Sequence, residues 1–441
     1  MFQTFKNAWK IEDLRKKILF TLMILVIFRL GAALPAPFVD AVALSKSTLT
    51  DSTTIFGFFD LMTGGSFSQA TLFALSVTPY INASIIIQLL QVVIPALDRL
   101  AKEGEEGRNK INRITRYSAI GISLALACVY YFLLKRQSAL IYTEGFAGVF
   151  SAIVIIACLT GGAVLLIWLG EQIDQKGIGS GISLLIFTGI ISNLVKAFAQ
   201  IKTYFQLAAG TYTANGTTYS AQPAYYVLVP LIIIMFAAMF VFIIVMTNAE
   251  RRIPVQYAKR VVGRKMYGGQ NTNIPIKVNM SGVLPVIFAS AFLSVPATIK
   301  NFFGINEGGW ATFLGWFETS GWLYAVLYAL LIMGFNYFYV AIQYNPIEMA
   351  NNLRKNSGTI PGIRPGKPTS EFIARVISKI TFIGGLFLIL VATLPIIITK
   401  TTGINISLGG TSVLIVVGVA LEISNTLESY MLMRHHKGFL E

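Results

Sequence analysis

Long apolar stretches constrain this chain more than any other feature. There are ten of them, and each approaches the roughly 20 residues that a helix needs to cross a bilayer. Strands of a membrane barrel would alternate apolar and polar residues over about ten positions, and these stretches do not alternate. With 55% hydrophobic and only 12% charged residues, the chain is too apolar for a soluble domain. We predict an all-α, polytopic membrane protein with ten transmembrane helices. The predicted spans lie near 18–37, 71–96, 117–134, 149–169, 181–198, 225–246, 280–299, 321–343, 372–398 and 408–430.

Lysine and arginine residues are divided unequally between the loops that these spans would leave. Of the 35, 27 lie in one alternating set of segments that includes both termini, seven lie in the other set, and Arg29 lies inside the first span. Because cationic loops resist translocation, the richer set is expected on the cytoplasmic side. Both termini can lie there only if the number of spans is even, which agrees with ten.

The side chains that membrane-embedded enzymes use are missing from the spans. Cys128 and Cys158 lie within spans and read as small apolar residues, while both histidines, His435 and His436, lie in the C-terminal tail. The sequence contains no HExxH zinc motif and no GxxxxGK[ST] phosphate loop. We therefore predict no enzymatic activity, no metal site, no cofactor and no nucleotide-driven motor within the chain itself.

Four ionisable residues in the spans are candidates for an ion or proton path: Arg29, Glu171, Glu422 and Glu428. Glu171 and Glu428 are close to helix ends, and we expect them to reach water. Arg29 and Glu422 are expected to pair with other helices or with a partner subunit. A secondary transporter would carry polar ligands near the membrane midplane on broken helices, so two isolated residues give that alternative little support.

The loop at 247–279 is long, basic and patterned. Its apolar residues alternate at two places, which predicts two short strands and therefore a projecting hairpin. The positive-inside rule explains the charge of such a loop equally well, but it does not explain the length or the regular pattern. The alternating residues are Ile253, Val255 and Tyr257, followed by Ile274, Ile276 and Val278.

The second long basic loop, at 345–371, carries Arg364 between two Pro-Gly pairs at 361–362 and 365–366. Pro-Gly pairs favour tight turns, so we expect the arginine to be held outward. Ordered cationic projections suit docking to a large anionic partner, such as ribosomal RNA or an acidic protein face. The predicted docking residues are Arg251, Arg252, Lys259, Arg260, Arg264, Lys265 and Arg364.

Six motifs, spread in order over nearly the whole chain, resemble the SecY family, the channel-forming subunits of the bacterial Sec protein translocase. They are PYINASIIIQLL, GIGSGISLLIF, RRIPVQYAKR, PIKVNMSGVLPVIFAS, PGIRPGKPT and GGTSVLIVVGVALE. The resemblance implies a channel that passes unfolded secretory polypeptides across the membrane and releases hydrophobic segments sideways into lipid. It also implies two inverted five-helix halves around a central pore, at 1–198 and 225–441, joined by an external hinge loop at 199–224. An inverted arrangement is required if a half with an odd number of spans is duplicated.

The resemblance also implies partners and a location. The expected partners are the small membrane subunits SecE and SecG, the ATPase SecA, a translating ribosome, substrate polypeptides that carry signal sequences, and the lipid bilayer. The expected location is the bacterial cytoplasmic membrane, with both termini in the cytoplasm.

The segment FDLMTGGSFSQA, residues 59–70, is half apolar but too short to cross a bilayer. In the SecY family the segment at this place folds as a short helix that re-enters the external funnel and plugs the resting pore, which implies a plug at about 55–70. Its large apolar side chains could pack against an apolar constriction, while its glycines and serines keep that packing weak. The alternative is an amphipathic helix at the outer interface. The predicted plug residues are Phe59, Asp60, Leu61, Met62, Gly64, Gly65 and Phe67.

A ring of apolar side chains that closes the pore is also implied by the resemblance. The motifs SVTPYI, GISLLI, PVIFAS and TSVLIVV carry its positions over to this chain, and every one of them is aliphatic here. A narrow apolar ring excludes ions by dewetting, without any fixed charge. Two pairs of members are four residues apart and therefore share a helix face. The predicted ring consists of Val77, Ile81, Ile182, Ile186, Ile287 and Ile415.

Two other classes of function stay open at this stage. By spacing alone, each ring residue could also face lipid or the protein core. A secondary transporter would move a small solute along an ion gradient without a partner, whereas a membrane scaffold without a pore would conduct no ions even after removal of the plug segment.

Overall fold

The structure is a computed structural model, and it describes most of the chain in twelve ranges. These are residues 9–40, 60, 63–210, 213–214, 217–218, 223–257, 260–262, 265–267, 271–303, 309–317, 322–404 and 409–437. The chain separates into two compact units. Unit 1 comprises Met1–Tyr225, Asn405–Leu408 and Val419–Glu441, and unit 2 comprises Tyr226–Ile404 and Gly409–Gly418.

Every predicted span overlaps a helix. In unit 1 these are α2 (Glu12–Ala33), α5 (Thr78–Val93), α7 (Glu105–Arg136), α8 (Gly145–Lys176) and α9 (Gly181–Ala208). The other five are α10 (Tyr225–Asn248), α11 (Leu284–Phe303), α13 (Trp322–Gln343), α15 (Lys367–Thr402) and α16 (Gly410–Lys437), which is divided between the units. Shorter helices are α6 (Pro95–Lys102), α12 (Gly309–Gly315) and α14 (Pro346–Lys355).

The polytopic helical class is confirmed. Seven helices among the described residues are long and apolar enough to cross a membrane, and there are eight if the bent pair α5 and α6 counts as one span. The full count of ten stays a prediction, because α2 carries several cations and the described side chains of α11 show an apolar helix over Leu284–Leu293 alone. The second predicted span ends in a sharp bend of 103° between α5 and α6. Ile94 precedes Pro95 there and is extended, as the residue before a proline prefers to be.

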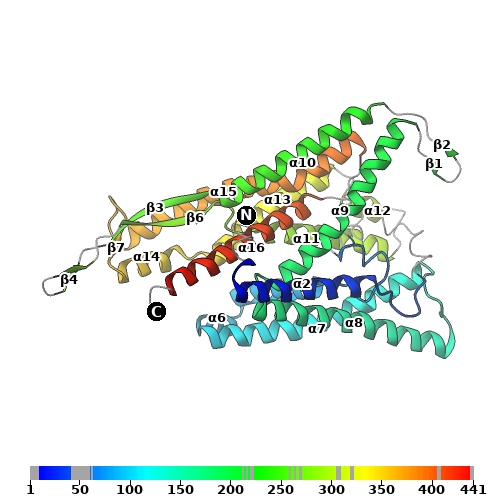
Figure 1. Cartoon of the computed structure of the whole chain (residues 1–441), viewed down its shortest axis with the longest axis horizontal. Coiled ribbons are helices and arrows are strands. Elements are labelled where there is room, and N and C mark those ends of the chain that lie inside the picture. Colours follow the sequence, from blue (N-terminus) through cyan, green and yellow to red (C-terminus); the bar gives the residue numbers. More distant parts are fainter. Residues whose placement is uncertain are drawn as a thin grey trace. The chain divides into compact units, whose positions relative to one another are not determined.

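Close helix packing in unit 1 depends on small residues. Helix α7 packs against α5 and α8, and α8 also packs against α2 and α9 (Figure 1). At the crossing of α8 and α9, a Cβ added to Gly181 would lie only 2.0 Å from the carbonyl oxygen of Gly170. Backbone contact of this kind is how membrane helices associate, because lipid offers no hydrophobic force to drive them together.

Unit 2 is organised around α13, which packs against α11 and α15. The centre of α13 carries Asn336, a fully buried polar residue. Its side-chain amide donates to the carbonyl oxygen of Thr381 at 2.8 Å, and its side-chain oxygen accepts from the hydroxyl of Ser281 at 2.5 Å. One polar residue of α13 therefore joins α15 and the bend before α11, and its hydrogen bonds are satisfied inside the protein, as burial in an apolar region requires.

The predicted hairpin is confirmed, although it is not simply a projection. Strand β3 (Glu250–Tyr257) pairs antiparallel with β6 (Asn271–Lys277), and β7 (Gly358–Thr359) pairs with the other edge of β3. Ile253, Val255 and Ile276 are buried in a cluster with Leu353 and residues of α15. The base of the hairpin is thus part of the core of unit 2, while short strands β4 (Arg260–Val262) and β5 (Lys265–Tyr267) pair further along it. Strands β1 (Thr213–Ala214) and β2 (Thr217–Thr218) form another small hairpin.

Candidate functional site

The described part of the predicted plug folds into compact turns. Asp60 organises them: its side chain accepts from the backbone amide of Ser68 at 2.8 Å, and its carbonyl oxygen accepts from the amide of Gly65 at 2.9 Å. The hydroxyl of Thr63 accepts from the amide of Phe67 at 3.1 Å. Asp60 and Thr63 have helical backbone and residues 64–70 form turns, whereas Phe59, Leu61 and Met62 lie outside the described residues, so the short helix stays a prediction.

The C-terminal end of this segment is anchored between α7 and α8. Phe67 is buried in a cluster with Leu134, Ile155 and Leu159, and its ring meets the ring of Tyr130 edge-on with centroids 4.8 Å apart. The Tyr130 hydroxyl donates to the carbonyl oxygen of Phe67 at 2.6 Å. The packing partner of Phe67 therefore differs from the apolar constriction that we expected.

The other end of the segment passes very close to α9 and α2. A Cβ added to Gly64 would lie 2.8 Å from the carbonyl oxygen of Gly189 and 2.8 Å from Nη1 of Arg29. Gly64 and Gly65 both have positive φ angles, 70° and 90°, which glycine adopts without strain. The glycine pair thus permits both the positive φ angles of the turn and the close contact with the α9 backbone.

Four predicted ring residues lie in unit 1. Val77 caps the start of α5, is almost fully buried, and its carbonyl oxygen accepts from the amide of Ile81 at 3.1 Å. Ile182 and Ile186 lie on consecutive turns of α9, and Ile186 is buried. Ile182 also reaches α8, where a Cβ on Gly170 would lie 3.0 Å from its Cγ1.

The other two ring residues, Ile287 and Ile415, lie in unit 2. Ile287 is half-buried near the start of α11, and Ile415 is buried in α16. Because the six residues come from both units, the complete ring stays a prediction.

The predicted docking residues lie around the hairpin of unit 2. Arg251 and Arg252 are exposed on β3, where Arg252 pairs with Glu250 at 2.7 Å. Arg364 is exposed in the turn before α15, and its carbonyl oxygen accepts from the hydroxyl of Thr369 at 2.8 Å. Arg260 and Lys265 have their backbone in β4 and β5. Lys259 and Arg264 lie outside the described residues.

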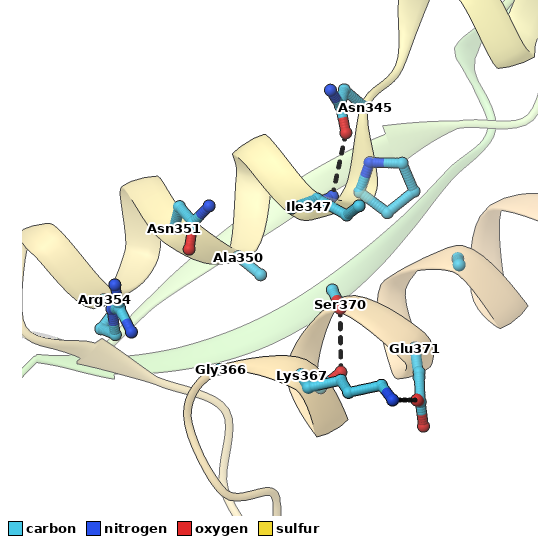
Figure 2. Close-up of a pocket in the computed structure, with 11 residues that line it drawn as sticks. Asn345, Ile347, Ala350, Asn351, Arg354, Gly366, Lys367, Ser370 and Glu371 are labelled. Atoms are coloured by element: carbon cyan, nitrogen blue, oxygen red, sulfur yellow. Dashed lines mark hydrogen bonds and ion pairs between the residues drawn. The ribbon is translucent and has the colours of Figure 1, made fainter.

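A surface pocket of about 640 Å³ lies close to this turn, between α14 and the start of α15 (Figure 2). Figure 2 shows Arg354 on the α14 side and Lys367 and Glu371 on the α15 side. Lys367 and Glu371 approach each other to 4.0 Å at the surface, where such a pair contributes little to stability. The pocket contains both charge signs and therefore does not single out one ligand.

The intramembrane ionisable residues fall into different environments. Glu171 pairs with Arg116 of α7 at 2.6 Å, so it bridges α7 and α8. The side chain of Arg29 donates to the hydroxyl of Ser192 on α9. Glu422 and Glu428 are exposed on α16, and the partner that we expect for Glu422 stays a prediction.

Sequence reasoning missed Tyr130, Ser192 and Asn193, the residues that hold the plug segment. Asn193 is buried and donates to the carbonyl oxygen of Asp60 at 3.4 Å. All three contact backbone carbonyl oxygens more than 60 positions away, and one sequence carries no signal for such pairs. The only hint is that Asn193 is an amide within an apolar span.

The fold is similar to those of known protein-conducting channels. "The structure of a protein conducting channel" matches with a TM-score of 0.62 at 20% identity, covering 94% of this chain and 92% of that one. A SecY channel whose plug domain is described as stabilising the closed state matches with a TM-score of 0.60, at 20% identity and the same coverage. Sec61 in the canine ribosome-channel complex from the endoplasmic reticulum matches with a TM-score of 0.59, again at 20% identity and with coverages of 94% and 92%.

Sequence comparisons cover the whole chain. It is 40% identical to the protein translocase subunit SecY of Thermotoga maritima, covering 100% of this chain and 98% of that protein. It is 41% identical to the protein translocase subunit SecY of Bacillus subtilis, covering 100% of both. The family model SecY matches residues 71–424, which begin directly after the plug segment and include all six predicted ring residues. The chain therefore belongs to the SecY family.

Proposed function

We propose that this chain is the protein-conducting channel of a Sec translocase. It translocates unfolded secretory polypeptides across the cytoplasmic membrane and releases hydrophobic segments laterally into the bilayer. The observation that carries the proposal is the segment at 64–70: its backbone forms turns, and it is largely buried within a helical membrane protein and held by α7 and α9. Irregular backbone at membrane depth is tolerated only where protein or a water-filled cavity surrounds it.

The segment acts as a plug, and the six aliphatic residues form the constriction. Such a constriction suits a channel that must admit almost any polypeptide, because its walls offer few specific hydrogen bonds. The positions of Val77 and Ile81 at the start of α5 support this role, since α5 directly follows the plug segment in the chain. The two inverted halves at 1–198 and 225–441, with the hinge at 199–224, are part of the proposal.

The hairpin of β3 and β6 and the turn around Arg364 form the docking surface for driving partners. We assign this surface to the cytoplasmic side, with both termini, because most lysines and arginines would lie there. The partners are SecA and the translating ribosome, with SecE and SecG as membrane subunits. A ribosome-bound channel among the similar structures supports the kind of partner.

Photocrosslinking to a stalled secretory chain tests this function. The full chain is reconstituted with its membrane subunits, and the photoreactive group is placed at Ile287 or, as a control, at Leu330 of α13, which is 65% exposed. We expect crosslinks from Ile287 to the stalled chain and none from Leu330. Crosslinks from neither position would contradict a channel, and solute uptake by the purified chain alone along an ion gradient would favour a secondary transporter.

A further inference from the structure

Arg29 is a cation inside the first span with an unusual set of neighbours. Its Nη2 donates to the hydroxyl of Ser192, whereas its Nη1 is buried with no hydrogen-bond partner among the described residues. Within the same residues, no carboxylate lies at ion-pair distance from its guanidinium. Burying a guanidinium with so few acceptors in an apolar region costs free energy, so Arg29 is a candidate for a functional role.

Its surroundings are the N-terminal end of the plug segment. Nη1 would lie 2.8 Å from a Cβ placed on Gly64, so the guanidinium is in direct contact with this glycine. The hydroxyl of Ser192 donates to the carbonyl oxygen of Gly64 at 3.4 Å. The next residue along α9, Asn193, donates to the carbonyl oxygen of Asp60. Residues of α2 and α9 thus hold this end through its backbone.

The donor and acceptor groups of these side chains determine the direction of each hydrogen bond. Arginine has five N–H donors and no acceptor, so the hydroxyl of Ser192 must use an oxygen lone pair toward Arg29. Its own proton is then left for the carbonyl oxygen of Gly64. Arg29 therefore orients the serine hydroxyl toward the segment, and a hydrogen bond that includes a charged donor is stronger than a neutral one.

We propose that Arg29 is a positioning residue that latches the Gly64 end of the plug to α9 through Ser192. This inference rests on the proposed function of the segment. The latch lies on one side of the Gly64-Gly65 pair, and the anchor formed by Phe67 and Tyr130 lies on the other. Release of the latch separates the Gly64 side of the segment from α9, while the hydrogen bonds that Asp60 and Thr63 accept keep the turn folded and the Phe67 end stays bound.

The test measures the accessibility of a buried position on the latch side. Thr63 is 1% exposed, and Thr63→Cys places a reporter thiol there of nearly the same size. The native Cys128 and Cys158 are replaced by alanine, and the full chain is reconstituted into vesicles with its membrane subunits. The measured quantity is the rate at which a membrane-impermeant maleimide labels the reporter.

Arg29→Gln should raise the labelling rate of the reporter roughly 10- to 100-fold, the range for loss of a charged hydrogen bond. Ser192→Ala, which removes the hydroxyl that bonds to Gly64, should raise it at least as much, and the double variant should exceed either single variant by little, because both act on one contact. Ser183→Ala, which removes another α9 hydroxyl whose partner is Ser180, should leave the rate unchanged. Thermal unfolding of each variant shows whether its fold is retained.

An unchanged or slower rate in folded Arg29→Gln protein would overturn the latch. If Arg29→Gln does not fold, the same criterion applies to Ser192→Ala. The proposed plug function is tested separately by deleting residues 60–67 and measuring resting ion conductance. Unchanged conductance in the deletion variant contradicts the plug itself, whereas raised conductance combined with an unchanged labelling rate in Arg29→Gln contradicts only the latch.

Discussion

Tyr130→Phe is the smallest change that should loosen the anchor of the plug segment. Tyr130 is 3% exposed, and its hydroxyl donates to the carbonyl oxygen of Phe67 at 2.6 Å. The substitution removes one oxygen atom and keeps the ring that packs edge-on against Phe67. Hydrophobic packing is therefore nearly unchanged, and the effect of the hydrogen bond is isolated.

The expected magnitude is that of one hydrogen bond. The carbonyl oxygen of Phe67 also accepts from the amide of Ala70 at 3.2 Å, so Tyr130→Phe removes one of its two donors and does not leave it unsatisfied. One such hydrogen bond contributes about 0.5–1.5 kcal/mol. A change of that size corresponds to roughly a 2- to 12-fold shift in the balance between the anchored and detached states of the segment. Phe67→Ala should cost more, about 3–5 kcal/mol, because it also leaves a cavity.

The assay is the labelling of a thiol beside the anchor. Ser66 is 2% exposed, and its hydroxyl has no hydrogen-bond partner among the described residues, so Ser66→Cys adds a reporter without removing a contact. We expect Tyr130→Phe to speed maleimide labelling of this reporter about 2- to 12-fold. Tyr131→Phe, at the next position on α7, is the matched control. Equal labelling rates in the two variants would refute the reasoning.

Three further predictions concern the constriction and the docking surface. Ile287→Asn and Ile415→Asn should each leak ions and export proteins with defective signal sequences, because a polar side chain wets the constriction and loses part of the roughly 1.5–3 kcal/mol that burying an isoleucine contributes. The control Leu330→Asn, at an exposed position of α13, should impair insertion without such a gain. Strictly signal-dependent export in both ring variants would contradict the assignment. Arg364→Glu should block translocation driven by SecA or ribosomes at a cost of about 2–5 kcal/mol in docking while leaving insertion intact, and unchanged translocation would argue against this docking site. Ile253→Ala should destabilise the base of the hairpin by about 2–5 kcal/mol and speed limited proteolysis of the 247–279 loop, so a wild-type cleavage rate would show that burial there is unimportant.

The sequence indicated those parts of the fold that depend on local pattern. Runs of apolar residues located the helices, and alternation over Ile253 and Val255 and again over Ile274 and Ile276 located the two strands of the hairpin. Each of these features is decided within a few residues of the chain, so a single sequence suffices to find it.

The anchoring of the plug segment could not be predicted in this way. Phe67 read as a residue for the constriction because its chemistry suits any apolar surface, and only the packing of α7 and α8 decides that it lies beside Tyr130. Arg29 was expected to pair with another helix or with a partner subunit, but the sequence could not identify Ser192, which is 163 positions away. The burial of the hairpin base was missed for the same reason, since β7 and α15 supply the contacts.

Hydrogen bonds after the glycine pair decide which part of the segment can move. The amide of Leu72 donates to the carbonyl oxygen of Leu34 at 2.9 Å, and the amide of Ala36 donates to that of Ala70, also at 2.9 Å. Leu72 also contacts α8, where a Cβ on Gly162 would lie 2.1 Å from its carbonyl oxygen. Freeing these groups inside a membrane protein would leave several buried polar groups unsatisfied at once, at about 1–3 kcal/mol for each.

The bonds from α9 to Gly64 and Asp60 are longer, at 3.4 Å from Ser192 and from Asn193. Within the segment, Asp60 and Thr63 accept shorter bonds of 2.8–3.1 Å from the residues that follow Gly64. The easiest displacement therefore breaks the bonds to α9 and moves this turn away from that helix with its internal hydrogen bonds intact. During translocation we expect a thiol at position 63 to become accessible and a thiol at position 66 to stay protected. Simultaneous exposure of both positions would show that the segment leaves as one body, with Phe67 drawn out of its cluster.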